Sequence, residues 1–133
     1  MKYFKHVNEI TDWMDTKKAL YYTGGDKRWL KDKLIWQRLF GPDESDDLIF
    51  GIAKLPPGEV HLLHRHADAP ELYFVLEGNG IFSVNEEVRD CMPGTGIYIP
   101  AGASHSVRNE GDKTLIFFFA YDRPRYQTTL EED

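Results

Sequence analysis

The stretch from Gly58 to Gly78 constrains this chain most, because it places two histidines and a glutamate on two predicted strands. In a β-strand, side chains two positions apart point to the same face. His64 and His66 therefore share one face of the first strand, and Glu71 opens the second strand after a short turn. If both faces point into one barrel, two imidazoles and a carboxylate meet there. This donor set suits a divalent transition metal.

A fourth donor is expected from a later part of the chain. His105 follows the Pro100-Ala101-Gly102 turn on another predicted strand, where a barrel can bring it beside the first three donors. His61 has the opposite strand parity to His64, so we expect it to point outward and not to bind metal. His6 is not expected to be a ligand either, and Glu77, just before a turn, is expected to be solvated.

Short segments rich in β-forming residues alternate with Gly- and Pro-containing turns through most of the chain. This pattern predicts an all-β sandwich or barrel with little helix. Besides the two strands of the His and Glu stretch, the predicted strands are residues 34–40, 48–55, 81–84, 87–89, 97–99, 104–108 and 114–121.

The chain is expected to be one domain of 133 residues: an N-terminal extension over 1–33, a barrel over about 34–121 and a polar tail over 122–133. In the extension, Tyr3–Val7 is predicted as a short edge strand. A helical turn is predicted near Thr11–Met14, with Asn8 or Thr11 as its cap.

Composition narrows the classes of partner. The formal net charge is −6 and no basic patch is visible, so nucleic acid and anionic membranes are not expected as partners. Cys91 is the only cysteine, which excludes an intramolecular disulfide and favours a reducing compartment. With no apolar signal segment at its start, we expect a cytoplasmic protein. All three tryptophans and two apolar strands lie in the first 55 residues, which predicts a homodimer with N-terminal strands packed across the partner.

Two sequence motifs resemble those of the cupin family. The first is met by Gly58, His64, His66, Glu71 and Gly78, and the second by Gly94, Pro100, Gly102, His105 and Asn109. The resemblance implies an all-β, cupin-type jelly-roll-like β-barrel that often dimerises. It also implies one divalent transition metal ion (Fe, Mn, Zn, Ni or Co), held by His64, His66, Glu71 and His105.

Four ligands on an octahedral ion leave two positions open, which is typical of a catalytic metal. Three imidazoles and one carboxylate leave net positive charge on the ion, so a small anionic, carboxylate-bearing molecule is the expected ligand. Tyr73 lies on the same face as Glu71, and these two residues are the candidate catalytic groups. Tyr73 can donate a hydrogen bond or transfer a proton, and its alternative role is to fill the barrel. Further candidates to line the interior are Trp36, Tyr98, Phe117 and Phe119.

The layout further resembles the small dimethylsulfoniopropionate lyases, which carry a tyrosine two residues after the glutamate, as Tyr73 is here. Those lyases also use a tyrosine beyond the last strand, for which Tyr126 and Tyr121 are candidates. The spacing between His66 and Glu71 is one residue longer than in those lyases. A metal-dependent lyase or isomerase is therefore predicted, with an Fe(II)-dependent dioxygenase and a non-catalytic small-molecule sensor as alternatives.

Overall fold

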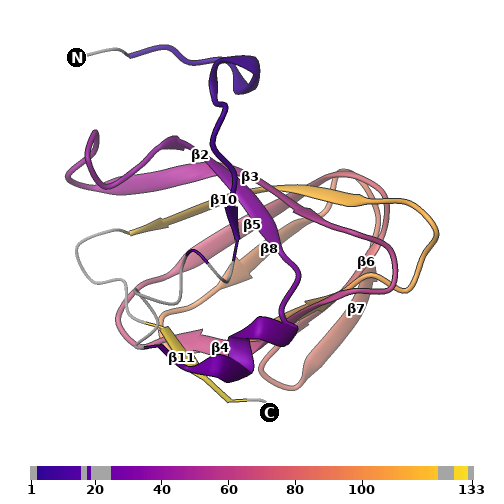
Figure 1. Cartoon of the computed structure of the whole chain (residues 1–133). Coiled ribbons are helices and arrows are strands. Elements are labelled where there is room, and N and C mark those ends of the chain that lie inside the picture. Colours follow the sequence, from indigo (N-terminus) through magenta and orange to yellow (C-terminus); the bar gives the residue numbers. More distant parts are fainter. Residues whose placement is uncertain (1–2, 16–17, 19–24, 123–127, 132–133) are drawn as a thin grey trace.

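Two antiparallel sheets stack to form the molecule (Figure 1). The candidate ligands lie on strands of both sheets. The computed structural model describes residues 3–15, 18, 25–122 and 128–131. In spatial order, the first sheet contains β1 (Met14–Asp15), β2 (Ile35–Phe40), β3 (Leu48–Leu55), β10 (Leu115–Asp122), β5 (Glu71–Glu77) and β8 (Gly96–Ile99). The second contains β11 (Thr128–Leu130), β4 (Val60–His66), β9 (His105–Arg108), β6 (Gly80–Val84) and β7 (Glu87–Cys91).

The all-β, jelly-roll-like fold predicted from the sequence is confirmed. The strand predicted over Leu48–Leu55 has the same bounds in the structure, and the hairpin of β6 and β7 turns at Asn85-Glu86. Asn85 has φ 53°, a left-handed conformation that asparagine tolerates in tight hairpin turns.

Alternation along the strands builds the core, because one face of each sheet looks toward the other sheet. The most deeply buried apolar side chains are contributed by β3, β5, β8, β9 and β10, and include Leu55, Val75, Ile99, Val107, Leu115 and Phe117. Because β5 is in the first sheet while β4 and β9 are in the second, both sheets contribute side chains to the same interior.

The extension before residue 34 differs from the prediction. Tyr3–Val7 is not a strand: the short 3-10 turn η1 (Val7–Glu9) follows an irregular segment and is capped by the side chain of His6. The edge strand is β1 instead, which pairs with Trp36 and Ile35 of β2. No helix among the described residues is long and apolar enough to cross a membrane.

Elements from both ends of the chain lie beside β4 (Figure 1). The 3-10 turn η2 (Lys27–Lys31) begins at its cap Asp26, and the Lys33 amide that follows it donates to the carbonyl of Val60. The predicted polar tail contains β11, which pairs with β4 from His64 to His66. Both ends of the chain therefore reach the strand that carries two of the candidate ligands.

Candidate metal centre

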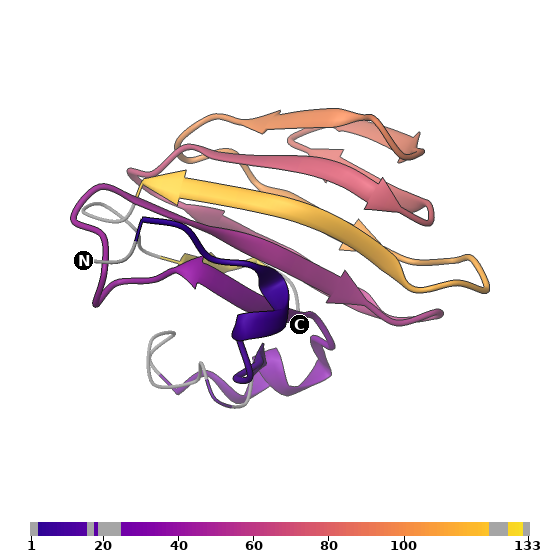
Figure 2. The same ribbon diagram turned by 90° about the horizontal axis from the view of Figure 1, so that it is seen from above.

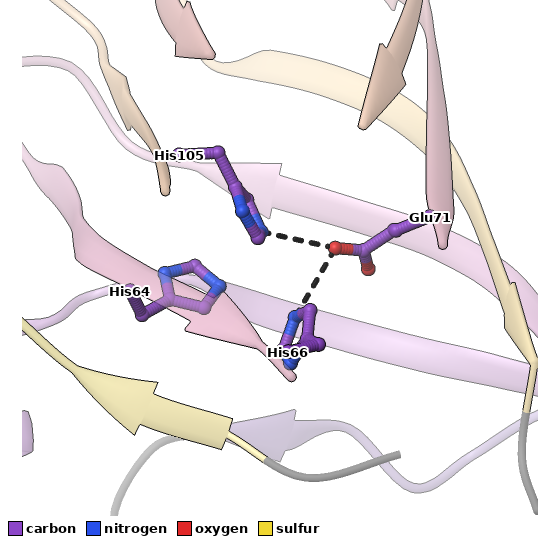
Figure 3. Close-up of side chains that lie close together, drawn as sticks. All are labelled: His64, His66, Glu71 and His105. Atoms are coloured by element: carbon purple, nitrogen blue, oxygen red, sulfur yellow. Dashed lines mark hydrogen bonds and ion pairs between the residues drawn. The ribbon is translucent and has the colours of Figure 1, made fainter. Parts of the chain in front are cut away.

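Four buried side chains converge between the sheets: His64, His66, Glu71 and His105 (Figure 3). One ligand atom from each lies within 4.8 Å of the ligand atoms of the others. The histidines come from β4 and β9 and the glutamate from β5. Strand parity together with the two sequence motifs predicts the same four residues.

Backbone and hydroxyl groups orient the three imidazoles. His64 Nδ1 lies 2.5 Å from the carbonyl oxygen of Leu62, and His105 Nδ1 lies 3.0 Å from that of Ala103. A carbonyl oxygen only accepts, so both Nδ1 atoms carry the proton and both Nε2 atoms are left as lone-pair donors for a cation. His66 Nδ1 lies 3.1 Å from the hydroxyl of Thr128 on β11.

The charges at the cluster match those of metal ligands. Burial alone would raise the pKa of the Glu71 carboxyl, but the neighbouring His66 and His105 rings hold that pKa well below its usual range. Burial, together with repulsion from His105, His61 and His66, lowers the pKa of His64 well below its usual value. Near neutral pH, Glu71 is therefore ionised and His64 is neutral, the forms that bind a metal.

The contacts of Glu71 provide a test of whether the cluster fits a cation. Glu71 Oε1 lies 3.1 Å from His105 Nε2 and 3.3 Å from His66 Nε2 (Figure 3). With the proton of His105 on Nδ1, its Nε2 turns a lone pair toward a carboxylate oxygen, and two acceptors this close repel each other. A bound cation would relieve that repulsion, so the residues fit a divalent metal.

Tyr73 contacts the cluster through its hydroxyl group. Its hydroxyl donates to Glu71 Oε1 at 3.1 Å, and only 4% of the residue is exposed. Its ring centre lies 4.7 Å from that of Phe117 and 6.0 Å from that of Phe82. The residue therefore both fills the barrel and presents a polar group to the candidate site.

His61 does not point outward, contrary to the prediction. Its side chain is 12% exposed, its ring centre lies 4.4 Å from that of His64, and its Nδ1 lies 2.7 Å from Asp32 Oδ2. The reason is a register shift between β4 and β9, which pairs His61 with Val107 but His64 with His105. The extra residue of this bulge resets the alternation of side chains. His61 is nevertheless not one of the four clustered donors.

The other residues singled out by the sequence have varied positions. Tyr121 pairs with Glu71 across β10 and β5, and burial followed by the charge of Glu71 raises the pKa of the Tyr121 phenol. Phe119 is buried and Trp36 packs against the same core, whereas Tyr98 is 69% exposed and lines nothing inside. Tyr126 lies outside the described residues. His6 is exposed, and Glu77 is exposed as expected.

Asn109, the last residue of the second motif, holds loops together and takes no part in the cluster. Its side-chain amide donates to the carbonyls of Leu55 and Lys113, at 2.9 and 2.7 Å. Gly78, the last residue of the first motif, has φ 75°, and a Cβ there would lie 2.7 Å from the carbonyl oxygen of Thr114. Both motif positions are therefore required by the fold.

Two stacked sheets with three histidines and a glutamate buried between them define a small barrel with an interior polar site. Residues 51–121 match the family model described as "Cupin domain". The match covers more than half of the chain, so the chain belongs to the cupin family.

Several characterised proteins are similar to this chain. The oxalate-binding protein of Thermotoga maritima is 36% identical over 52% of this chain and 57% of its own length. The dimethylsulfoniopropionate lyase DddW of Ruegeria pomeroyi is 36% identical over 53% of this chain and 47% of its own length. A 5-nitrosalicylic acid 1,2-dioxygenase of a Bradyrhizobium species is 35% identical over 56% of this chain and 36% of its own length. The chain spans about half the length of the first two relatives and a smaller share of the third.

A similar solved structure is a cupin-2 domain from Rhodospirillum rubrum. It superposes with a TM-score of 0.76 over 100% of this chain and 82% of its own, at 19% identity. This likeness supports the fold.

Proposed function

We propose that the protein is a metal-dependent cupin that acts on a small carboxylate-bearing anion, as an enzyme of lyase or isomerase type. The observation that carries the proposal is the convergence of His64, His66, Glu71 and His105 in a buried cluster. Their donor atoms and orienting hydrogen bonds suit one divalent transition metal ion, and Glu71 and His64 favour the protonation forms that bind a metal.

When bound, a divalent cation supplies a Lewis-acid site for an anionic oxygen of the substrate. The chain's own groups would do the rest. The Tyr73 hydroxyl points at Glu71, so a substrate oxygen held at the cluster comes within its reach as a donor or proton-transfer group. Tyr121, whose pKa is raised, stays protonated and is suited to donate a hydrogen bond but not to act as a base. The four candidate ligands and Tyr73 are buried, which limits the access of bulk water to these contacts.

The names of the relatives support this class and leave its reaction open. Both the oxalate-binding relative and the lyase relative handle small molecules that bear a carboxylate, which favours an anionic ligand. An Fe(II)-dependent dioxygenase is the second candidate, because one relative is a dioxygenase and the same donor set binds iron with room for O₂. A sensor that binds its ligand without turnover is the non-catalytic alternative.

The metal is tested by elemental analysis of protein purified without chelators and without a nickel column. His105→Ala removes one donor and should sharply reduce the bound metal, because three donors remain from four. His6→Ala is the matched control, since His6 is exposed and only caps η1. Full metal occupancy in His105→Ala would remove the proposed site.

The ligand is tested by calorimetry with oxalate and other small carboxylates, on metal-loaded and metal-free protein. Turnover without O₂ supports a lyase or isomerase, oxygen consumption supports the dioxygenase, and binding alone supports the sensor. For a turned-over substrate, Tyr73→Phe should lower kcat by about 10²–10⁴-fold if its hydroxyl transfers a proton. Unchanged kcat in a metal-replete variant would restrict Tyr73 to a packing role.

We also propose that the protein is a homodimer, formed through the outer face of the first sheet. Leu72, Phe74 and Leu76 point outward from β5 and are 44%, 38% and 45% exposed, and Tyr98 beside them on β8 is 69% exposed. Figure 2 looks onto this sheet: the N-terminal segment, in indigo, lies near β2, while β10 and β5 are open to view. The outward face of β5 carries no charged side chain, and an apolar sheet face of this kind is normally covered by another layer of protein.

A second copy of the chain can supply that layer. Tyr3 and Phe4 are 75% and 87% exposed, although Lys5 next to them is held at Glu44 and over the Phe40 ring. The chain thus carries both an uncovered apolar face and an uncovered apolar arm, which a twofold pairing would cover together. Aromatic side chains bury about 150–250 Å² each, and stable interfaces bury about 800 Å² per partner.

Light scattering tests the dimer. Wild type should have twice the 15.4 kDa of one chain, and Phe74→Lys should shift it toward the monomer. Val88→Lys on β7, a 60% exposed position of the other sheet, should leave the dimer intact. A monomeric wild type at micromolar concentration would contradict the proposal.

A further inference from the structure

A carboxylate in the N-terminal extension is buried beside the candidate metal centre. The Asp32 side chain has no exposed surface. Its Oδ1 accepts the amide proton of Leu34 at 3.0 Å, and its Oδ2 accepts that of Leu62 at 2.8 Å. The Leu62 amide lies at the bulge where β4 changes register against β9. Asp32 therefore fixes the backbone of β4 two residues before the first candidate ligand.

The same carboxylate holds a ring against that ligand. Asp32 Oδ2 lies 2.7 Å from His61 Nδ1, and because a carboxylate accepts, Nδ1 carries the proton of this bond. The His61 ring centre is 4.4 Å from the His64 ring centre. Trp29 also packs against this ligand, with its ring edge-on to His64 at 5.4 Å and 6.4 Å from the His61 ring. The His64 ring thus contacts two aromatic side chains from outside the cluster.

We propose that Asp32 and His61 form a positioning pair that sets the orientation of the His64 imidazole toward the metal. The inference rests on the proposed metal function and goes beyond it, because Asp32 and Trp29 precede residue 51, where the match to the cupin domain begins. The extension of this chain thereby controls the geometry of a site whose four donors all lie in the cupin domain.

The physical reason lies in how few contacts orient His64. Among the described residues, the one hydrogen bond of its ring is from Nδ1 to the Leu62 carbonyl, so packing must limit the rotation of the ring. Asp32 acts on both constraints, since it binds the Leu62 amide and fixes the His61 ring. Groups that orient metal ligands in this way typically change metal affinity by about 10–100-fold when they are altered.

The test uses full-length protein loaded with Co(II), whose visible absorption reports coordination geometry, and chelator competition to measure the dissociation constant. Asp32→Asn keeps the size of the side chain but can turn an N–H toward the His61 proton. We expect about 10–100-fold weaker Co(II) binding and shifted absorption bands. His61→Asn, which keeps an N–H toward Asp32 and removes only the ring, should change both in the same direction. If Asp32→Asn does not fold, His61→Asn alone tests the positioning pair.

Asp26→Ala is the control for general loosening of the extension, because Asp26 caps η2 and lies outside the cluster. It should lower Tm and leave the cobalt spectrum and affinity unchanged. If wild type binds cobalt and His61→Asn binds it with the same affinity and spectrum, the positioning pair is refuted and the metal site stands. It is equally refuted if Asp26→Ala matches the effects of His61→Asn. A wild type that takes up no cobalt refutes the metal function and the inference together.

Discussion

Replacing Tyr73 by phenylalanine removes one hydroxyl and keeps the ring that packs against Phe117. The hydroxyl donates to Glu71 Oε1, and both residues are buried, at 4% and 7% exposure. A hydrogen bond to a charged group contributes about 1.5–3 kcal/mol to stability. Glu71 keeps its contacts with His66 and His105, so the loss should lie within that range and not above it.

For a chain of this length, 1 kcal/mol corresponds to about 3–4 °C in Tm. Metal-free Tyr73→Phe should therefore unfold roughly 5–10 °C below metal-free wild type in a thermal scan. Loading with a divalent metal should reduce the difference, because the cation then compensates the charge of Glu71. Metal content should stay the same, since all four candidate ligands remain.

Tyr98→Phe is the matched control, because it deletes the same hydroxyl from a side chain that is 69% exposed in the single chain and keeps the apolar ring of the proposed dimer face. Exposed substitutions of this kind usually change stability by less than about 0.5 kcal/mol. If metal-free Tyr73→Phe unfolds at the same temperature as Tyr98→Phe, the hydroxyl of Tyr73 does not serve the Glu71 carboxylate in solution.

Three further predictions concern metal removal, pH and the sheet. Chelation should lower the Tm of metal-loaded wild type, since a ligand at 100 times its Kd stabilises the folded state by about 2.7 kcal/mol. The Tm of His105→Ala should not change when the chelator is added. The raised pKa of Tyr121 means that the unfolded chain loses this proton at lower pH than the folded chain, so stability should fall as pH rises above 10. Urea titrations of wild type and Tyr121→Phe at pH 9 to 11 check this, and an equal fall in both would assign it to other groups. Gly51→Ala makes a methyl group clash with the Gln37 carbonyl oxygen and should lower the free energy of unfolding by about 3 kcal/mol or more. Gly96→Ala meets nothing within 4 Å and should be tolerated, so equal denaturation midpoints for the two variants would contradict this prediction.

Strand alternation and motif spacing predicted the fold and the four clustered donors because both depend on residues close together in sequence. The same alternation placed His61 wrongly, since the bulge in β4 adds one residue and restores an inward direction. Nothing in a single strand reports such a shift, which depends on the register with β9.

The supporting groups were not predictable for a different reason. Asp32 meets His61 and Leu62 across about 30 positions of sequence, and Thr128 meets His66 across 62. β11 is only three residues long and polar at two of them, so it has no recognisable strand pattern. Both contacts come from tertiary packing of chain ends against β4.

The four donors are divided unequally between the sheets: three lie on β4 and β9, and Glu71 lies alone on β5 of the other sheet. A cation held by all four would cross-link two layers that are otherwise joined by packing, by connecting loops and by the contacts of Glu71 with His66 and His105. Without the cation, each sheet keeps its own ladder of backbone hydrogen bonds. Loss of the cation should therefore let the two sheets slide or separate before either sheet unfolds. Backbone amide hydrogen exchange should then become faster first around β4, β5 and β9, the strands that carry the four donors.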